Sequence, residues 1–169
     1  PLLKGKDRET ANAVKGRLAA LAGDPEKLSP FVNEIVNAST VAFTGMKSLD
    51  ALLVISAGLV LAQPTNPRAT NLFAAILHTA NRFLDAAGVL EYTRTISHEN
   101  ILALLNLANV LLDLKEDERA RMLLERVIAR DGRNRDAHKA MGYYWHKKGN
   151  NALARQAMEK AVKDFPDHV

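Results

Sequence analysis

The chain lacks cysteine altogether, and aromatic side chains make up only 5% of its 169 residues. The absence of cysteine excludes disulfides and thiolate metal sites. The shortage of aromatics, beside abundant alanine and leucine, favours closely packed helices over a sheet rich in β-branched and aromatic residues. With 47% hydrophobic and 25% charged residues, the composition is that of an ordinary soluble protein. We therefore expect an all-α, soluble protein, either cytoplasmic or periplasmic.

Long hydrophobic runs are also missing. The most apolar stretch, 49–62, is interrupted by Asp50 and Ser56, and it is shorter than the roughly 20 residues that a membrane crossing needs. We expect no transmembrane segment and interpret this stretch as a helix that its neighbours bury. If one side of it stays uncovered instead, the exposed apolar patch would favour self-association.

Neither sign of charge predominates, since the net charge is only +4. Basic and acidic residues cancel up to Asp113, ten against ten, and the excess lies from Lys115 onward, with thirteen basic and nine acidic residues. Acids are interleaved with these bases, which is typical of a solvated helix face. No long basic run or aromatic platform accompanies them, so nucleic-acid binding is not favoured. A C-terminal basic surface for RNA or an acidic membrane face is kept as a third possibility.

The sequence has none of the usual catalytic motifs. It contains no glycine-rich phosphate loop, no nucleophile elbow and no paired acids in a mixed α/β setting. Five histidines are present, but none is part of an HxxxH or HExxH pair, and His138 and His146 are eight residues apart. We expect no enzymatic activity, no cofactor and no metal site.

What is present is an internal repeat of 34 residues. Four positions of each unit recur at this spacing: three are mostly small residues and the fourth is a helix breaker in most units. From the last unit to the first, the residues at these positions are Gly142, Ala154, Ala161 and Pro166; Ala108, Ala120, Val127 and Gly132; Ala74, Ala86, Thr93 and His98; Thr40, Leu52, Leu59 and Pro64. An independent column holds large apolar residues at Trp145, Leu111, Leu77 and Phe43. Together they predict hairpins of two helices, with a small residue that permits close approach and a large one that fills the space beside it.

Turn and capping residues divide these hairpins into helices. Pro30 and Pro67 lie where we expect helices to begin, because proline is tolerated in a first turn. A further helix, 6–22, precedes the repeats and ends at Gly23-Asp24-Pro25. The predicted helices thus number about nine: 6–22, 31–44, 48–62, 67–80, 83–97, 99–113, 117–130, 135–148 and 151–164.

This pattern resembles the tetratricopeptide repeat family, whose unit is a 34-residue antiparallel helix pair with these signposts. The resemblance covers about 33–168 and is most complete in the last unit. It implies a right-handed α-solenoid, or superhelix, of four repeats at approximately 33–66, 67–100, 101–134 and 135–168. Residues 1–29 would form an N-terminal capping helix and linker ahead of the repeat region 30–169. The family's fold also implies a concave groove, lined by the first helices, that binds a peptide or protein partner.

The resemblance assigns the groove to one stripe of each first helix. This gives Asn37, Val41 and Thr44; Asn71, Ala75 and His78; Leu105, Asn109 and Leu112, with Asn106 beside them; and Lys139, Tyr143 and His146. Asparagine is a mediocre helix former, so its recurrence here needs compensation. Its carboxamides could clamp the backbone of an extended peptide, or they could bond to neighbouring helices or water. Lys139 and Tyr143 could receive an acidic or C-terminal group. The carboxylate-clamp members of the family are not matched, because Lys139 is the one basic residue of the stripe.

The two ends of the repeat region differ. The helix at 6–22 is expected to cap the first repeat, whereas Met158 and Val162 in the last predicted helix have no evident cover. An alternative function is therefore homo-oligomerisation through that assembly face. The chain begins at Pro1 rather than Met, as expected of a trimmed fragment or a matured product, and the alanine- and leucine-rich style suggests a bacterial protein.

Overall fold

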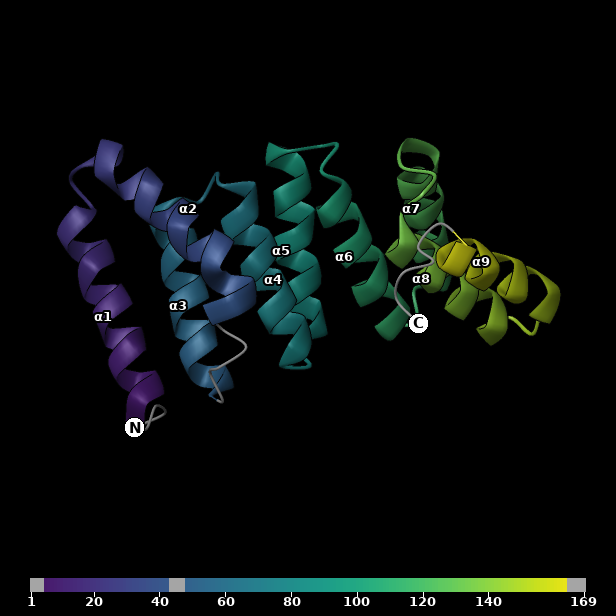
Figure 1. The fold of residues 1–169 in the computed structure, drawn as a ribbon, viewed down its shortest axis with the longest axis horizontal. Helices are drawn as coiled ribbons and strands as arrows, with labels where there is room; N and C mark the ends of the chain where they lie inside the picture. The colour runs from purple at the N-terminus through teal and green to yellow at the C-terminus, as the bar shows by residue number, and fades with distance from the viewer. Residues whose placement is uncertain (1–4, 43–47, 164–169) are drawn as a thin grey trace. The chain divides into compact units, whose positions relative to one another are not determined.

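A computed structural model of the chain describes residues 5–42 and 48–163. Over these ranges the chain forms nine α-helices and no strand (Figure 1). The helices are α1 (Gly5–Leu21), α2 (Pro25–Ala42), α3 (Leu49–Ala62), α4 (Pro67–Thr79), α5 (Phe83–Ile96), α6 (Ile101–Asp113), α7 (Asp117–Arg130), α8 (Arg135–Lys147) and α9 (Asn151–Lys163). The prediction of an all-α, helical-repeat fold is confirmed. From α3 onward every predicted boundary agrees within two residues.

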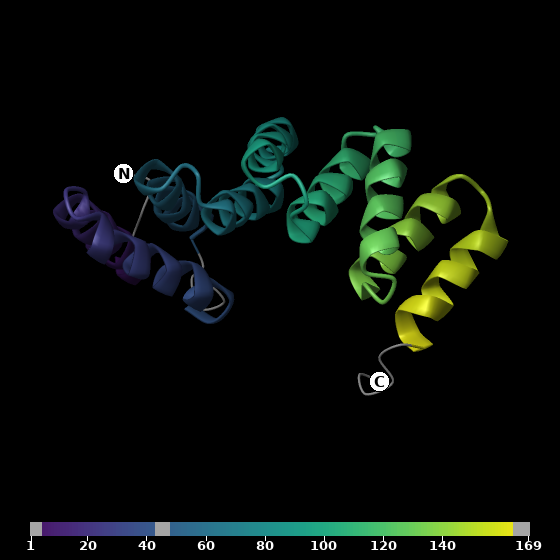
Figure 2. The same ribbon diagram turned by 90° about the horizontal axis from the view of Figure 1, so that it is seen from above.

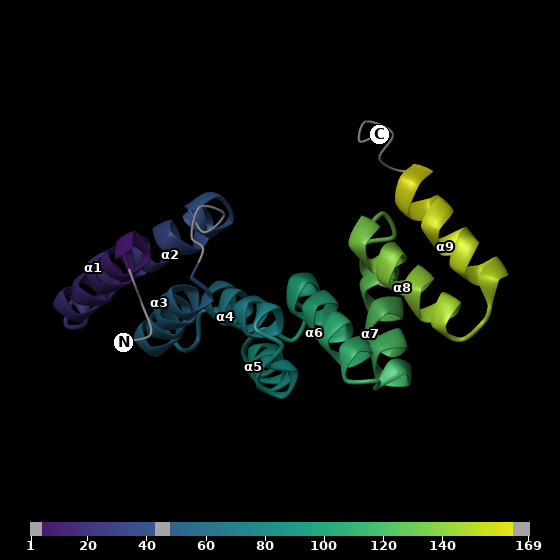
Figure 3. The same cartoon turned by 90° about the horizontal axis from the view of Figure 1, so that it is seen from below.

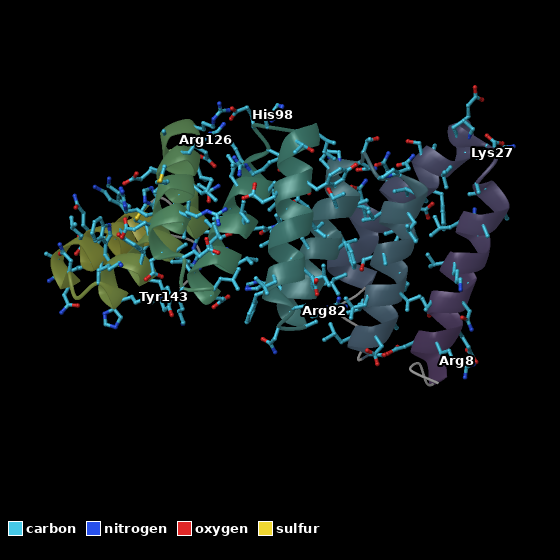
Figure 4. The ribbon with its side chains drawn as sticks, turned by 180° about the vertical axis from the view of Figure 1, so that it is seen from behind. Arg8, Lys27, Arg82, His98, Arg126 and Tyr143 are labelled. Atoms are coloured by element: carbon cyan, nitrogen blue, oxygen red, sulfur yellow. The ribbon has the colours of Figure 1, made fainter. Side chains whose placement is uncertain are left out.

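The chain divides into two compact units, Pro1–His98 and Glu99–Val169. In unit 1, α4 packs against α5, α3 against α4, and α1 against α3. In unit 2, α6 pairs with α7, α8 pairs with α9, and α7 also packs against α8 (Figure 2). In both units helices that are consecutive in the sequence pack together, and in unit 1 α1 also packs against α3, with α2 between them in the chain. In unit 1, the labelled residues Arg82 and His98 mark the two ends of α5 (Figure 4).

Asparagine starts the first helix of three successive hairpins. The Oδ1 atoms of Asn66, Asn100 and Asn134 accept hydrogen bonds from main-chain N–H groups in the first turns of α4, α6 and α8, respectively. Such caps are each worth about 1 kcal/mol. The three residues are spaced by 34, so this column of caps recurs in register with the repeat, although our sequence analysis did not use it.

The turn inside each of these hairpins has a second recurring feature. Asn81, Lys115 and Gly149, again 34 residues apart, have positive φ angles of 58°, 65° and 75°. The next residue donates its N–H to a carbonyl five positions back, as in the bond of 2.9 Å from Asn150 to Trp145. These bonds form a Schellman motif, which satisfies the last carbonyls of the first helix and reverses the chain.

One predicted helix start is wrong. α2 begins at Pro25 rather than near residue 31, so Pro30 lies inside the helix. The reason is Asp24, whose side chain accepts a hydrogen bond of 3.2 Å from the N–H of Lys27 and so caps the helix one residue ahead of Pro25. Pro30 forfeits one helical hydrogen bond, but the earlier start lets Leu28 join the core of unit 1. Pro67 does occupy the first turn of α4, as predicted.

The small-residue columns lie at helix contacts. Within the second, third and fourth predicted repeats these positions are buried: Ala74, Ala86, Thr93, Ala108, Ala120, Val127, Gly142, Ala154 and Ala161. Of the large-residue column, Leu77 and Leu111 are buried, while Trp145 is half-buried and makes an edge contact with the Tyr144 ring. Phe43 lies outside the described residues, as does Pro166.

The apolar helix α3 is buried by its neighbours on one side and exposed on the other. Ala51, Ile55 and Leu59 are buried in a cluster with residues of α1 and α2, whereas Val54 and Leu61 on the other side are exposed. Among the described residues, no helix has both the length and the hydrophobicity that a membrane crossing requires.

Candidate protein-binding surface

α6 is buried almost all round and reaches solvent along one narrow stripe. Leu102 and Asp113 are exposed, and Asn106 and Asn109 between them are half-buried. Their spacings of four, three and four residues place all four side chains on one side of the helix. The sequence analysis identified the two asparagines but missed Leu102 and Asp113, which this same spacing could have revealed.

The side chains of the two asparagines in this stripe make no polar contact within the described residues. Neither the Asn106 nor the Asn109 carboxamide is hydrogen-bonded to any described part of the chain. Asparagine lowers helix stability relative to alanine, and here no internal hydrogen bond offsets that cost. Each carboxamide can donate and accept, which suits it to the N–H and C=O groups of a peptide backbone.

α8 continues this surface, because α6 and α8 are the first helices of successive hairpins and contact each other. Lys139, Tyr143 and His146 are all exposed on α8, and Tyr143 occupies the same repeat position as Asn109. In Figure 4, Tyr143 lies at the opposite edge of unit 2 from Arg126. We call the set Leu102, Asn106, Asn109, Asp113, Lys139, Tyr143 and His146 the α6–α8 surface.

Two residues predicted to line the groove in unit 2 do not reach solvent. Leu105 and Leu112 are only 7% and 5% exposed. Their repeat equivalents on α8, Lys139 and His146, are exposed. The prediction that these leucines offer side chains to a ligand is therefore wrong, because they belong to the core of unit 2.

Three of the predicted groove residues in unit 1 are buried or contact other parts of the protein. Asn37 is exposed, and its Oδ1 accepts a hydrogen bond of 3.0 Å from Arg68. Asn71 is buried, with 3% of its surface exposed. His78 is half-buried, with its ring 5.5 Å from that of Phe83. The side chains of Val41 and Thr44 lie outside the described residues, and Ala75 is exposed.

A polar network holds the C-terminal half of α8 against the start of α7. Lys147 donates to Asp117, and the Tyr144 hydroxyl donates to Glu118 at 2.9 Å. Lys148 lies 3.6 Å from Asp117 and 3.5 Å from Glu118. These contacts fix the helix turn that presents Tyr143 and His146.

The same contacts shift the ionisation of the groups involved. The hydrogen bond from Lys147 lowers the pKa of Asp117, and those from Tyr144 and Arg121 lower the pKa of Glu118. Burial, and then the bond to Glu118, raises the pKa of Tyr144. Both carboxyls are thus held as carboxylates, and the Tyr144 hydroxyl is held in its protonated form.

The remaining histidine of α8 has a structural position. His138 is buried, and its Nε2 lies 2.9 Å from the carbonyl oxygen of Gly132 in the preceding turn. Over residues 5–42 and 48–163, no group of three or more acidic, histidine or cysteine side chains is placed to hold a metal ion.

The structure and the comparisons with known proteins agree on the class of repeat. Residues 77–142 match the tetratricopeptide repeat family. The resemblance seen in the sequence is thereby confirmed, and the match covers the hairpin α6–α7 together with parts of its neighbours. No curated protein sequence matches the chain.

Solved tetratricopeptide-type structures share the fold at low sequence identity. A crystal structure of MamA superposes with a TM-score of 0.68 at 15% identity, covering 96% of this chain and 95% of that one. YrrB, described as a tetratricopeptide repeat protein with an unusual peptide-binding site, gives 0.68 at 18% identity, with 95% and 82% covered. MamA from Desulfovibrio magneticus RS-1 gives 0.66 at 14% identity, with 98% and 99% covered. At such identities the likeness establishes the fold alone.

Proposed function

We propose that this protein is a non-enzymatic interaction module that binds a peptide or a segment of another protein on the α6–α8 surface. The observation that carries the proposal is the pair Asn106 and Asn109, half-buried in a helix stripe without hydrogen bonds to the described chain. The tetratricopeptide match and the helical-repeat fold support a role in protein–protein interaction. That one groove continues over all four predicted repeats stays a prediction.

The chemistry of the surface favours an extended backbone as the ligand. Asn106 and Asn109 would bond successive peptide groups, and Tyr143 offers a large, stiff ring that loses little entropy on contact. Lys139 shares the first half of α8 with the exposed Asp136, so the charges of the surface do not by themselves set the direction in which a peptide binds.

Charge pairing argues against a nucleic-acid partner. Most of the C-terminal arginines are neutralised within unit 2: Arg119 pairs with Glu116, Arg121 with Glu118 and Glu125, and both Arg126 and Arg130 with Glu99. A nucleic-acid footprint would instead need clustered bases available to phosphates. Strong salt-dependent retention on heparin would contradict this part of the proposal.

Affinity capture tests the α6–α8 surface directly. The immobilised protein is exposed to extract of its native cell, beside the double variant Asn106→Ala/Asn109→Ala, and the bound proteins are identified by mass spectrometry. A synthetic segment of the captured partner is then titrated by calorimetry. We expect the double variant to bind at least about tenfold more weakly, because two backbone contacts are lost.

The matched control is Asn151→Ala, which removes an exposed asparagine at the first position of α9. It should capture the partner as well as the parent protein does. Equal capture by the parent and the double variant, with unchanged helical circular dichroism, would rule out the α6–α8 surface as the binding site.

A further inference from the structure

α9 presents a second apolar surface, separate from the α6–α8 surface. Met158 and Val162, the residues predicted to form an assembly face, are 42% and 59% exposed. With Arg155, Glu159 and Lys163 they line an open recess of about 560 Å³. We call these five residues the α9 face. In Figure 3, α9 lies at the edge of unit 2, and α8 is the one helix of that unit that packs closely on it.

The preceding hairpin carries the same face in the same register. Thirty-four residues before Met158 and Val162 stand Leu124 and Ile128 of α7, and Arg121 and Glu125 precede Arg155 and Glu159 by the same interval. Arg121 pairs with Glu125, as Arg155 pairs with Glu159 at 2.8 Å. On α7 the apolar part of this face is covered, because α7 packs against α6 and also against α8: Leu124 is fully buried and Ile128 is half-buried, while Glu125 stays exposed.

What covers the α7 face shows which kind of structure fits the α9 face. α8 lies against α7 with its C-terminal residues Tyr144, Lys147 and Lys148 on the acids that open α7, so the two helices run antiparallel. Apart from α6, the partner of α7 in its own hairpin, the covering element is thus one amphipathic helix. A helix in the same position on α9 would bury Met158 and Val162 further, as the helices packed on α7 bury Leu124.

The charges of the two faces differ in sign. The α7 face and the helix start beside it carry three acids, Asp117, Glu118 and Glu125, and one base, Arg121. On α9, Asn151 and Ala152 replace the first two acids, and Lys163 stands where α7 has Ala129. With Arg155 and Glu159, α9 therefore carries two bases and one acid. Lys163 has no acidic partner among the described residues. A lysine-ended helix such as α8 would find no acceptors here, whereas an acidic helix would pair with Lys163.

We propose that the α9 face binds an acidic amphipathic helix of a partner protein, aligned antiparallel to α9. Its apolar side covers Met158 and Val162, and its acids lie in the N-terminal half, opposite Lys163. Its C-terminal half is uncharged where it meets Asn151 and Ala152. This contact does not depend on the α6–α8 surface, so the protein would hold two partners, or two segments of one partner, at once.

Two designed helical peptides test the proposal. Both have one face of leucine and alanine, and the residues that flank it in the N-terminal half are glutamate in one peptide and lysine in the other. Each fluorescent peptide is titrated with the full chain, and binding is followed by anisotropy. We expect the acidic peptide to bind about tenfold or more tightly than the basic one, and Met158→Glu or Val162→Glu to weaken it by a similar factor. Lys163→Glu should reverse the preference.

Control variants separate this surface from the other. Met122→Glu changes an exposed methionine of α7 outside the α9 face and should leave binding unchanged, as should Asn106→Ala/Asn109→Ala. Circular dichroism identifies any variant that fails to fold. Lys163→Glu keeps the test decisive in that case, because its side chain is exposed.

Three results would overturn the proposal. The first is equal binding of the two peptides, and the second is no binding of the acidic peptide at millimolar concentration. The third is a concentration-dependent dimer, seen by sedimentation or light scattering and abolished by Met158→Glu, since a second copy of the chain would then occupy the face.

Discussion

The hairpins α6–α7 and α8–α9 have the same skeleton and different surfaces. Both begin with an asparagine cap, reverse at a left-handed residue and bury small residues at the helix contact. They differ where a side chain meets solvent or a further helix, as with Leu124 against Met158 and Asp117 against Asn151. The comparison teaches that the repeated positions determine the fold, while the positions that vary between repeats determine what each surface can bind.

Truncation at one repeat position should separate the two hairpins most clearly. Leu124→Ala should destabilise the protein by about 3 kcal/mol, because it leaves a cavity in a fully buried site. Met158→Ala, at the equivalent position, should cost only about 1 kcal/mol, because that side chain is 42% exposed although it also packs on Gly142 of α8. Urea denaturation followed by circular dichroism measures both. Equal losses would mean that the α9 face is covered within the molecule.

Reciprocal exchange at the left-handed turn position should have the next largest effect. Lys115 holds a φ of 65°, and Gly149 holds 75° in the next hairpin. A side chain in this region costs about 1 kcal/mol, so Lys115→Gly should raise stability by about that amount and Gly149→Lys should lower it.

Steric clashes do not complicate the substitution at Gly149. A Cβ atom at Gly149 would meet no other atom within 4 Å, so only the backbone angle is tested there. If both substitutions left the thermal midpoint unchanged, the left-handed residue would not contribute to the stability of the repeat.

The helix boundaries also show which structural features a sequence can predict. Helix boundaries followed from residues that act locally, such as Pro67 at a helix start and the Lys148-Gly149-Asn150 turn. The start of α2 was missed because the Asp24 cap competed with the stronger signal of Pro30. The columns of asparagine caps and left-handed turns were readable at the same spacing of 34 but were not used.

The candidate surface was predicted less well than the fold, for a physical reason. Leu105 and Lys139 hold the same repeat position, yet one is buried and the other exposed. Exposure depends on which helix packs alongside, and a repeat register alone does not contain that information. Asn71 holds this position in the preceding repeat, 34 residues before Leu105, and it is buried as well.

Acidification should reveal the smallest of the differences between the hairpins. The pKa values of Asp117 and Glu118 are lowered by Lys147 and Tyr144, respectively. Carboxyls whose pKa is lower in the folded than in the unfolded state stabilise the fold above the unfolded value. That contribution is lost as the pH falls through the folded value, so stability should decline between about pH 5 and pH 3. The start of α9 carries no such pair.

The double variant Asp117→Asn/Glu118→Ala gives α7 the residues that α9 has at these positions. It should be less stable than the parent at pH 7 and should lose less stability on acidification, because two of the responsible carboxyls are gone. Urea midpoints measured at intervals from pH 7 to pH 3 provide the comparison. Parallel decline of parent and variant would show that other carboxylates govern acid sensitivity, and that the polar contact between α7 and α8 serves to orient α8 without adding acid-sensitive stability.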